Sequence, residues 1–254
     1  MENNKIIIAL AGKGGVGKTS LSASFVKVLV NRFPDKRILA IDADPAIGLS
    51  TALGIQPEST IDDIRKAIVT NVEQGNTRDA IELLNEARYR IFDTLVEADG
   101  FSFIAVGRPE SAGCYCKVNA YLKEVIGILS DEFDIIVIDG EAGIEQINRR
   151  VMEKVSHLVL VTDPSRKGTQ VVKTILKVAD ELVMYEKTGV VVNRMNDEGL
   201  KDILDLGDIP VLAYIPDDRN LQYFDVRGQS VFNIPGDSAI VRGAEEALSN
   251  LGIL

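Results

Sequence analysis

The sequence predicts an α/β fold: a single doubly wound domain spanning 1–254, with a mostly parallel sheet and helices on both faces. Seven short apolar runs have strand length and nearly continuous apolar character, which is typical of strands buried on both faces. Between them lie stretches whose apolar residues recur at helical spacing. Strands that alternate with helices indicate a parallel sheet, and a chain of 254 residues with 46% hydrophobic content is long enough to bury one.

The expected elements follow one another in a regular order. Strands are expected at 5–11, 37–42, 101–106, 133–139, 157–163, 188–193 and 210–215. Helices are expected at 19–33, 120–131, 168–182, 197–206 and near the end of the chain, over 239–254. The polar segment 57–98 carries two further helical patterns and is expected to form a helical insertion outside the sheet.

Composition excludes several classes of function. No stretch approaches 18 consecutive apolar residues, and the opening "MENNKIIIALAGKGG" is unlike a secretory leader, so we expect a cytoplasmic protein without a membrane partner. The formal charge of -10 opposes binding to a phosphate backbone, which relies on clustered basic side chains. Nucleic acid is therefore not an expected partner.

The first predicted strand is followed by the glycine-rich stretch "GKGGVGKT", residues 12–19. It satisfies G-x-x-x-x-G-K-[ST] between a strand and a helix, the context in which this motif binds nucleotide phosphates. Its glycines let backbone N–H groups converge on phosphate oxygens at a helix N-terminus, Lys18 should reach the β- and γ-phosphates, and Thr19 should ligate Mg²⁺. The expected phosphate-binding residues are Gly12, Lys13, Gly14, Gly15, Val16, Gly17, Lys18, Thr19 and Ser20.

Both cysteines of the chain, Cys114 and Cys116, stand two positions apart in "ESAGCYCKVN". A reducing cytosol disfavours a strained local disulfide, and the polar, glycine-bearing flanks argue against two small buried hydrophobes, so the pair indicates a metal or redox site. Two thiolates are half of a tetrahedral site, and His157, the one histidine, begins an apparent core strand where a structural role is expected. A symmetric homodimer would supply the other two thiolates.

The glycine loop has a second lysine, Lys13, and K-G-G-x-G-K-[ST] resembles the deviant Walker A motif of the MinD/ParA/nitrogenase-iron-protein class. The resemblance implies that Lys13 crosses a homodimer interface to the partner's nucleotide; the alternative is a solvated surface lysine. The stretch "IDADPAIGLS", 41–50, resembles switch I of this class, in which Asp44 would position Mg²⁺ through water, or the attacking water. Nitrogenase iron proteins carry a further aspartate where Gly48 stands here, so that role is not transferred.

The stretch "IDGEAGIE", 138–145, resembles switch II of the same class. It implies that Asp139 is an outer Mg²⁺ ligand acting through water and that the backbone of Gly143 contacts the γ-phosphate. Asn193 is placed like the residue that reads adenine, with Arg194 beside it, although a plain capping role for Asn193 is equally compatible. The loop "YIPDDR", 214–219, resembles the one that closes over the base through Pro216 and Asp217. ATP is favoured over GTP because no N-K-x-D-type guanine motif occurs.

Taken together, the deviant loop, "CYC" followed by K-x-N, "EAGIE" and the Asp163-Pro164 pair resemble the CooC-type nickel-insertion ATPases. This resemblance implies an ATP-hydrolysing metallochaperone that forms a homodimer with nucleotide, holds Ni²⁺ or Zn²⁺ at Cys114 and Cys116, and serves carbon monoxide dehydrogenase or acetyl-CoA synthase. Thiolates do not choose between the two ions unaided. A bridging iron–sulfur cluster and a MinD/ParA-like positioning ATPase remain alternatives, although the final helix, with one arginine and two glutamates, is not a basic membrane anchor.

Overall fold

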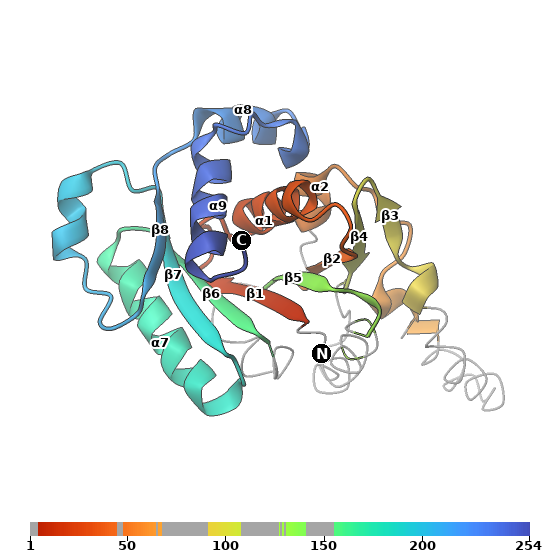
Figure 1. Cartoon of the computed structure of the whole chain (residues 1–254), viewed down its shortest axis with the longest axis horizontal. Coiled ribbons are helices and arrows are strands. Elements are labelled where there is room, and N and C mark those ends of the chain that lie inside the picture. Colours follow the sequence, from red (N-terminus) through yellow and green to blue (C-terminus); the bar gives the residue numbers. More distant parts are fainter. Residues whose placement is uncertain are drawn as a thin grey trace.

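The fold is built on a single mixed sheet, which is predominantly parallel (Figure 1). The computed structural model describes residues 5–44, 48–64, 66–67, 91–107, 127, 129, 131–140 and 155–254. Its eight strands follow the order β3-β4-β2-β5-β1-β6-β7-β8. They are β1 (Ile6–Gly12), β2 (Ile38–Asp42), β3 (Val96–Ala98), β4 (Phe101–Ala105), β5 (Ile135–Asp139), β6 (His157–Thr162), β7 (Lys187–Asn193) and β8 (Val211–Ile215). Every pairing except β3 with β4 is parallel, which confirms the predicted fold class.

Helices cover both faces of the sheet (Figure 1). One face carries α1 (Lys18–Arg32), α2 (Gly48–Leu53), α8 (Arg219–Val226) and α9 (Ala239–Asn250), and the other carries α7 (Arg166–Leu182). Successive strand residues point to opposite faces, so β1 sends Ile8 and Leu10 into one apolar cluster and Ala9 and Ala11 into the other. Burial on both sides explains why the strands have continuous apolar sequences rather than alternating ones.

Two predictions of secondary structure were wrong. Val96–Ala98, expected to end a helix outside the sheet, forms β3 and pairs antiparallel with β4 at the sheet edge. Gly100, with a φ of +83°, lies in the reversal between these strands, a conformation that favours glycine. The expected helix over 197–206 is a 3₁₀ segment, η1 (Glu198–Ile203), none of whose residues is buried, so there is no packed face to extend it into an α-helix.

The strand order places the functional residues together. β1 lies between β5 and β6, so the chain leaves β1 in one direction toward β2 and later returns on its other side. Ligands of such sheets bind at the carboxyl ends of the strands where the order reverses. Register pairs Asp42 of β2 directly with Asp139 of β5 at that edge, next to the end of β1.

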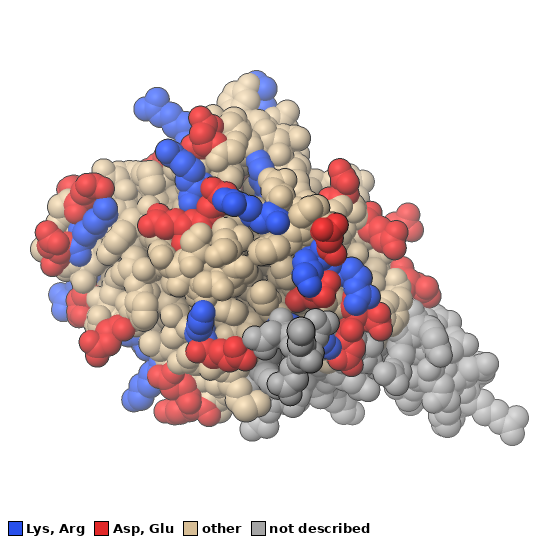
Figure 2. Space-filling model, viewed as in Figure 1, with Lys and Arg blue, Asp and Glu red and all other residues tan. Residues whose placement is uncertain are grey.

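The exposed surface is electrostatically mixed. Lys and Arg side chains are interspersed with Asp and Glu over the described part of the face shown in Figure 2. Among the described residues, no helix combines the length and apolar character needed to cross a bilayer.

Candidate nucleotide site

The glycine loop between β1 and α1 forms an anion-binding cradle. Gly15 and Gly17 have φ angles of +78° and +92°, in the left-handed region that side chains disfavour. Gly17 is the N-cap of α1 and has no side chain with which to cap the helix, so the N–H groups of the first turn face the loop without competition from one. Backbone N–H groups converging at a helix N-terminus attract phosphate oxygens.

The two lysines of the loop are held in different ways. Lys18 is 7% exposed, and its Nζ donates hydrogen bonds to the carbonyl oxygens of Gly12 (3.2 Å) and Lys13 (3.3 Å). Lys13 instead pairs with Oδ2 of Asp163, just beyond β6, at 3.2 Å. Burial raises the pKa of Asp163, but hydrogen bonds from Ser165 and the nearby Lys13 ammonium outweigh it and leave that pKa below its usual value. Lys13 is therefore engaged within its own chain.

Asp42, to which the sequence patterns assigned no role, is fully buried and fixes the backbone on both sides of the D-P pair in switch I. Its Oδ1 accepts the backbone N–H of Asp44 at 3.1 Å, and its Oδ2 accepts that of Leu49 at 2.8 Å. Burial and the neighbouring Asp139 raise the pKa of Asp42 to about 7 despite these bonds. Its position at the end of the second predicted strand, next to the D-P pair, was the signal that could have identified it.

Asp139 is placed where a magnesium ligand is expected. It is completely buried, and its Oδ1 accepts a hydrogen bond from the Ser22 hydroxyl at 2.9 Å. Burial raises its pKa to about 6, opposed by the side chains of Thr19 and Ser22 and by the charge of Lys18. Its Oδ2 is a buried oxygen for which the described residues provide no hydrogen-bond donor. An orphaned carboxylate oxygen beside Thr19 fits Mg²⁺, which prefers oxygen ligands and, when bound, would neutralise phosphate charge.

The residues expected to bind the base gather on the other side of the loop. Asn193, 7% exposed, donates from Nδ2 to the Val16 carbonyl at 2.8 Å and accepts the Arg194 N–H at 3.0 Å. Arg194 has a φ of 60°. Asn196 and Asp217 bond reciprocally, at 2.7 and 2.8 Å, and so join the segment after β7 to the loop containing Pro216. Asn193 thus braces the phosphate loop, and its reading of adenine stays a prediction.

The remaining predicted residues are distributed as follows. Cys114, Cys116 and Gly143 lie outside the described residues. A Cβ at Gly48 would lie 3.5 Å from Cγ2 of Thr19, so the position that lacks an aspartate here faces the expected magnesium ligand. His157 is 7% exposed with Nδ1 2.8 Å from the Ser156 hydroxyl, and burial lowers its pKa, in keeping with the structural role predicted for it.

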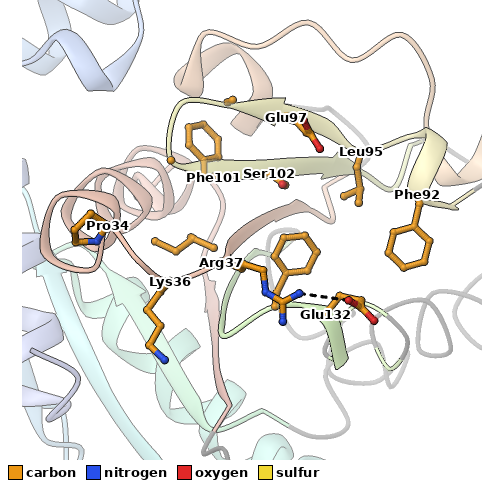
Figure 3. A pocket seen from close by; sticks show the side chains of 13 residues that line it. Pro34, Lys36, Arg37, Phe92, Leu95, Glu97, Phe101, Ser102 and Glu132 are labelled. Atoms are coloured by element: carbon orange, nitrogen blue, oxygen red, sulfur yellow. Dashed lines mark hydrogen bonds and ion pairs between the residues drawn. The ribbon is translucent and has the colours of Figure 1, made fainter.

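A separate cavity of about 490 Å³ lies at the opposite, amino ends of β2 and β4 (Figure 3). Phe101, Leu95 and Phe92 contribute apolar walls, and the Arg37 guanidinium pairs with Glu132 at 3.4 Å beside them. None of the predicted nucleotide-binding residues lines this cavity. The nucleotide site is therefore identified by the residues at the carboxyl ends of the strands and does not coincide with this cavity.

A glycine cradle between a strand and a helix, with a buried aspartate at the end of the neighbouring strand, defines a P-loop nucleoside triphosphatase. Residues 7–231 match the model of the CobQ/CobB/MinD/ParA nucleotide binding domain. The chain belongs to this family and is a P-loop ATPase, and ATP with Mg²⁺ fits its site.

Comparisons with individual proteins agree. The "Uncharacterized ATP-binding protein MJ0685" of Methanocaldococcus jannaschii is 34% identical, covering 95% of this chain and 96% of the relative. The carbon monoxide dehydrogenase accessory protein CooC of Rhodospirillum rubrum is 28% identical, with 89% of each covered, and the septum site-determining protein MinD of Synechocystis is 26% identical, covering 92% and 85%. The crystal structure of Pyrococcus furiosus cell division ATPase MinD superposes with a TM-score of 0.71 over 97% of this chain and 98% of that one; at 23% identity this shows the fold alone.

Proposed function

We propose that this ATPase is a metallochaperone that binds nickel or zinc through Cys114 and Cys116 of two subunits. The observation that carries the proposal is the C-x-C spacing of the only two cysteines in a chain whose phosphate loop also carries Lys13. Two thiolates complete a tetrahedral site only when a second pair is supplied, and a two-fold interface supplies it. The client would be a nickel enzyme, carbon monoxide dehydrogenase or acetyl-CoA synthase.

Nucleotide would drive the metal site through a change of population. ATP favours a closed dimer if it contacts that state better than the open one, and Lys13 reaching the partner's nucleotide would be such a contact. Closure would bring the four thiolates around one ion. Hydrolysis would remove the γ-phosphate that holds switches I and II, and each separated subunit would then hold the ion through two thiolates only.

The relation to the Rhodospirillum rubrum accessory protein CooC supports this proposal, because that similarity extends over 89% of both chains and is not confined to the phosphate loop. The buried Asp139, with Thr19 beside it, supports the nucleotide half of the cycle. The metal half rests on the two cysteines alone.

Metal stoichiometry tests the proposal directly. Equilibrium dialysis with Ni²⁺ and with Zn²⁺ should give one ion per dimer with a non-hydrolysable ATP analogue, with mass followed by light scattering. Cys114→Ser/Cys116→Ser should lose the ion and keep nucleotide binding. Lys13→Ala retains both thiols, so its metal binding should fall only in proportion to the fraction of dimer that is lost. Metal binding that survives the double substitution would refute the site. Brown, iron-containing protein after anaerobic purification would point to a cluster instead.

A second candidate is a MinD-like positioning ATPase, favoured by the 26% identity to Synechocystis MinD over 92% of this chain. It predicts ATP-dependent sedimentation with anionic lipid vesicles and no cysteine-dependent metal. Both assays can be run on the same protein preparation. Cysteine-dependent metal binding would favour the metallochaperone, and ATP-dependent sedimentation with vesicles in its absence would favour the positioning ATPase.

A further inference from the structure

The short helix α2 begins within switch I, and its first residue lies against Thr19, the expected magnesium ligand. Its first residue, Gly48, is so close to Thr19 that an added Cβ would contact the threonine side chain at 3.5 Å. The N–H of Leu49 donates to Asp42 Oδ2 at 2.8 Å. The start of α2 is therefore fixed to the buried carboxylate that also orients Asp44.

The end of α2 is held by a residue far along the chain. The Ser230 hydroxyl donates to the Leu53 carbonyl at 2.8 Å. Gly54 follows with a φ of +76°, and a Cβ there would come within 2.9 Å of the Ser230 Cβ, so the two segments are in close contact. The same hydroxyl accepts the Phe232 N–H at 3.2 Å and so caps the 3₁₀ turn η2 (Val231–Asn233).

A buried lysine anchors this turn to the helix that begins at the phosphate loop. Lys27 of α1 is 6% exposed, and its Nζ donates to the Val231 carbonyl at 3.3 Å and to the Ile234 carbonyl. No described carboxylate forms an ion pair with it. Burial lowers its pKa, as expected when an ammonium leaves water without an anionic partner. Burying a lysine in this way is costly, and an apolar side chain would fill the space more cheaply.

We propose that Lys27 and Ser230 are positioning residues for ATP hydrolysis, because together they tie the end of α2 to α1 and thereby hold Gly48, at the start of α2, against Thr19. The path is continuous: Lys27 holds η2, Ser230 joins η2 to Leu53, and α2 carries Gly48 and Leu49 back to the site. Ser230 is also connected to the loop 214–219 through α8, which begins at the last residue of that loop, because the N–H of Gln229 donates to the Phe224 carbonyl of α8 at 2.9 Å. This role concerns ATP hydrolysis alone and does not depend on nickel or zinc binding at Cys114 and Cys116.

The test compares two pairs of variants matched in the type of hydrogen bond removed, with control residues at exposed positions. Ser230→Ala removes a side-chain bond to a carbonyl, and Asn250→Ala removes a similar bond, from Nδ2 to the Leu212 carbonyl at 2.7 Å, far from the site. Lys27→Met removes a lysine bonded to backbone carbonyls, and Lys187→Met removes another, which donates to the Leu251 carbonyl at 2.7 Å. Methionine preserves the length and apolar stem of the lysine.

Steady-state hydrolysis, ADP affinity and Tm are measured for all four variants. Ser230→Ala and Lys27→Met should lower kcat by about 3- to 10-fold while the Kd for ADP changes by less than about 2-fold, because a displaced switch I affects the transition state more than ground-state binding. The double variant should lose less than the product of the single losses, since both act on one path. Asn250→Ala and Lys187→Met should lower Tm and leave kcat unchanged. If kcat follows Tm equally in all four, or stays at the wild-type value in Ser230→Ala, the positioning role is refuted.

Discussion

The Lys13–Asp163 pair leads to a quantitative prediction about subunit association. The two groups are 3.2 Å apart, and their side chains are 29% and 21% exposed. At this separation the attraction is about 5 kcal/mol for an effective dielectric constant of 20 and about 1 kcal/mol in bulk water. Because partly exposed pairs lose most of this to desolvation and side-chain ordering, a net value of about 1 kcal/mol is the appropriate one.

A lysine that reaches a partner's nucleotide must first leave Asp163. Asp163→Asn removes the charge but keeps an oxygen for the bonds from Ser165. Releasing Lys13 should therefore tighten dimer formation by about fivefold for each lysine, or about 25-fold for the two in a dimer, since 1.4 kcal/mol corresponds to tenfold.

Sedimentation equilibrium with Mg²⁺ and a non-hydrolysable ATP analogue measures this dissociation constant. Asp205→Asn is the matched control, because it breaks a lysine–aspartate pair with Lys173 on the exposed surface and should leave association unchanged. An Asp163→Asn protein that dimerises as weakly as wild type, or more weakly, would show that Lys13 makes no favourable contact across the interface.

Three further outcomes are expected. Gly17→Ala should weaken ADP binding by about 5- to 150-fold in a fluorescence titration, because a φ of +92° and an approach of 2.5 Å to Asn193 Nδ2 strain any side chain there by about 1 to 3 kcal/mol; unchanged affinity would contradict the loop geometry. Phe25→Ala, at a fully buried position, should cost about 3 to 5 kcal/mol in urea unfolding, and a loss below 1 kcal/mol would be inconsistent with that packing. The folded-state pKa of His157 lies below the ordinary 6.5, so the unfolded chain binds the extra proton first and stability should fall as pH drops from 6.5 toward the folded value. His157→Gln should flatten this slope between pH 5 and 8, and an unaltered slope would assign it to other groups.

Much of the fold could be predicted from local patterns. Strands buried on both faces leave continuous apolar runs, and α1 and α7 leave helical spacing, so their positions follow from the chain alone. The edge strand β3 was missed because its three residues were read as the end of a longer helical pattern. At a sheet edge, pairing with one neighbour decides the conformation, and that neighbour is identified only in the folded chain.

The phosphate loop can be identified from its residues alone, because Gly12 through Thr19 act through backbone conformation and short-range contacts. Which distant side chains meet that loop depends instead on how the chain folds. Lys13 and Asp163 are 150 positions apart, and Lys27 lies 204 positions from the carbonyl of Val231 that it holds. Such contacts depend on strand order and helix packing, which place distant segments within hydrogen-bonding reach and leave no periodic trace in the sequence.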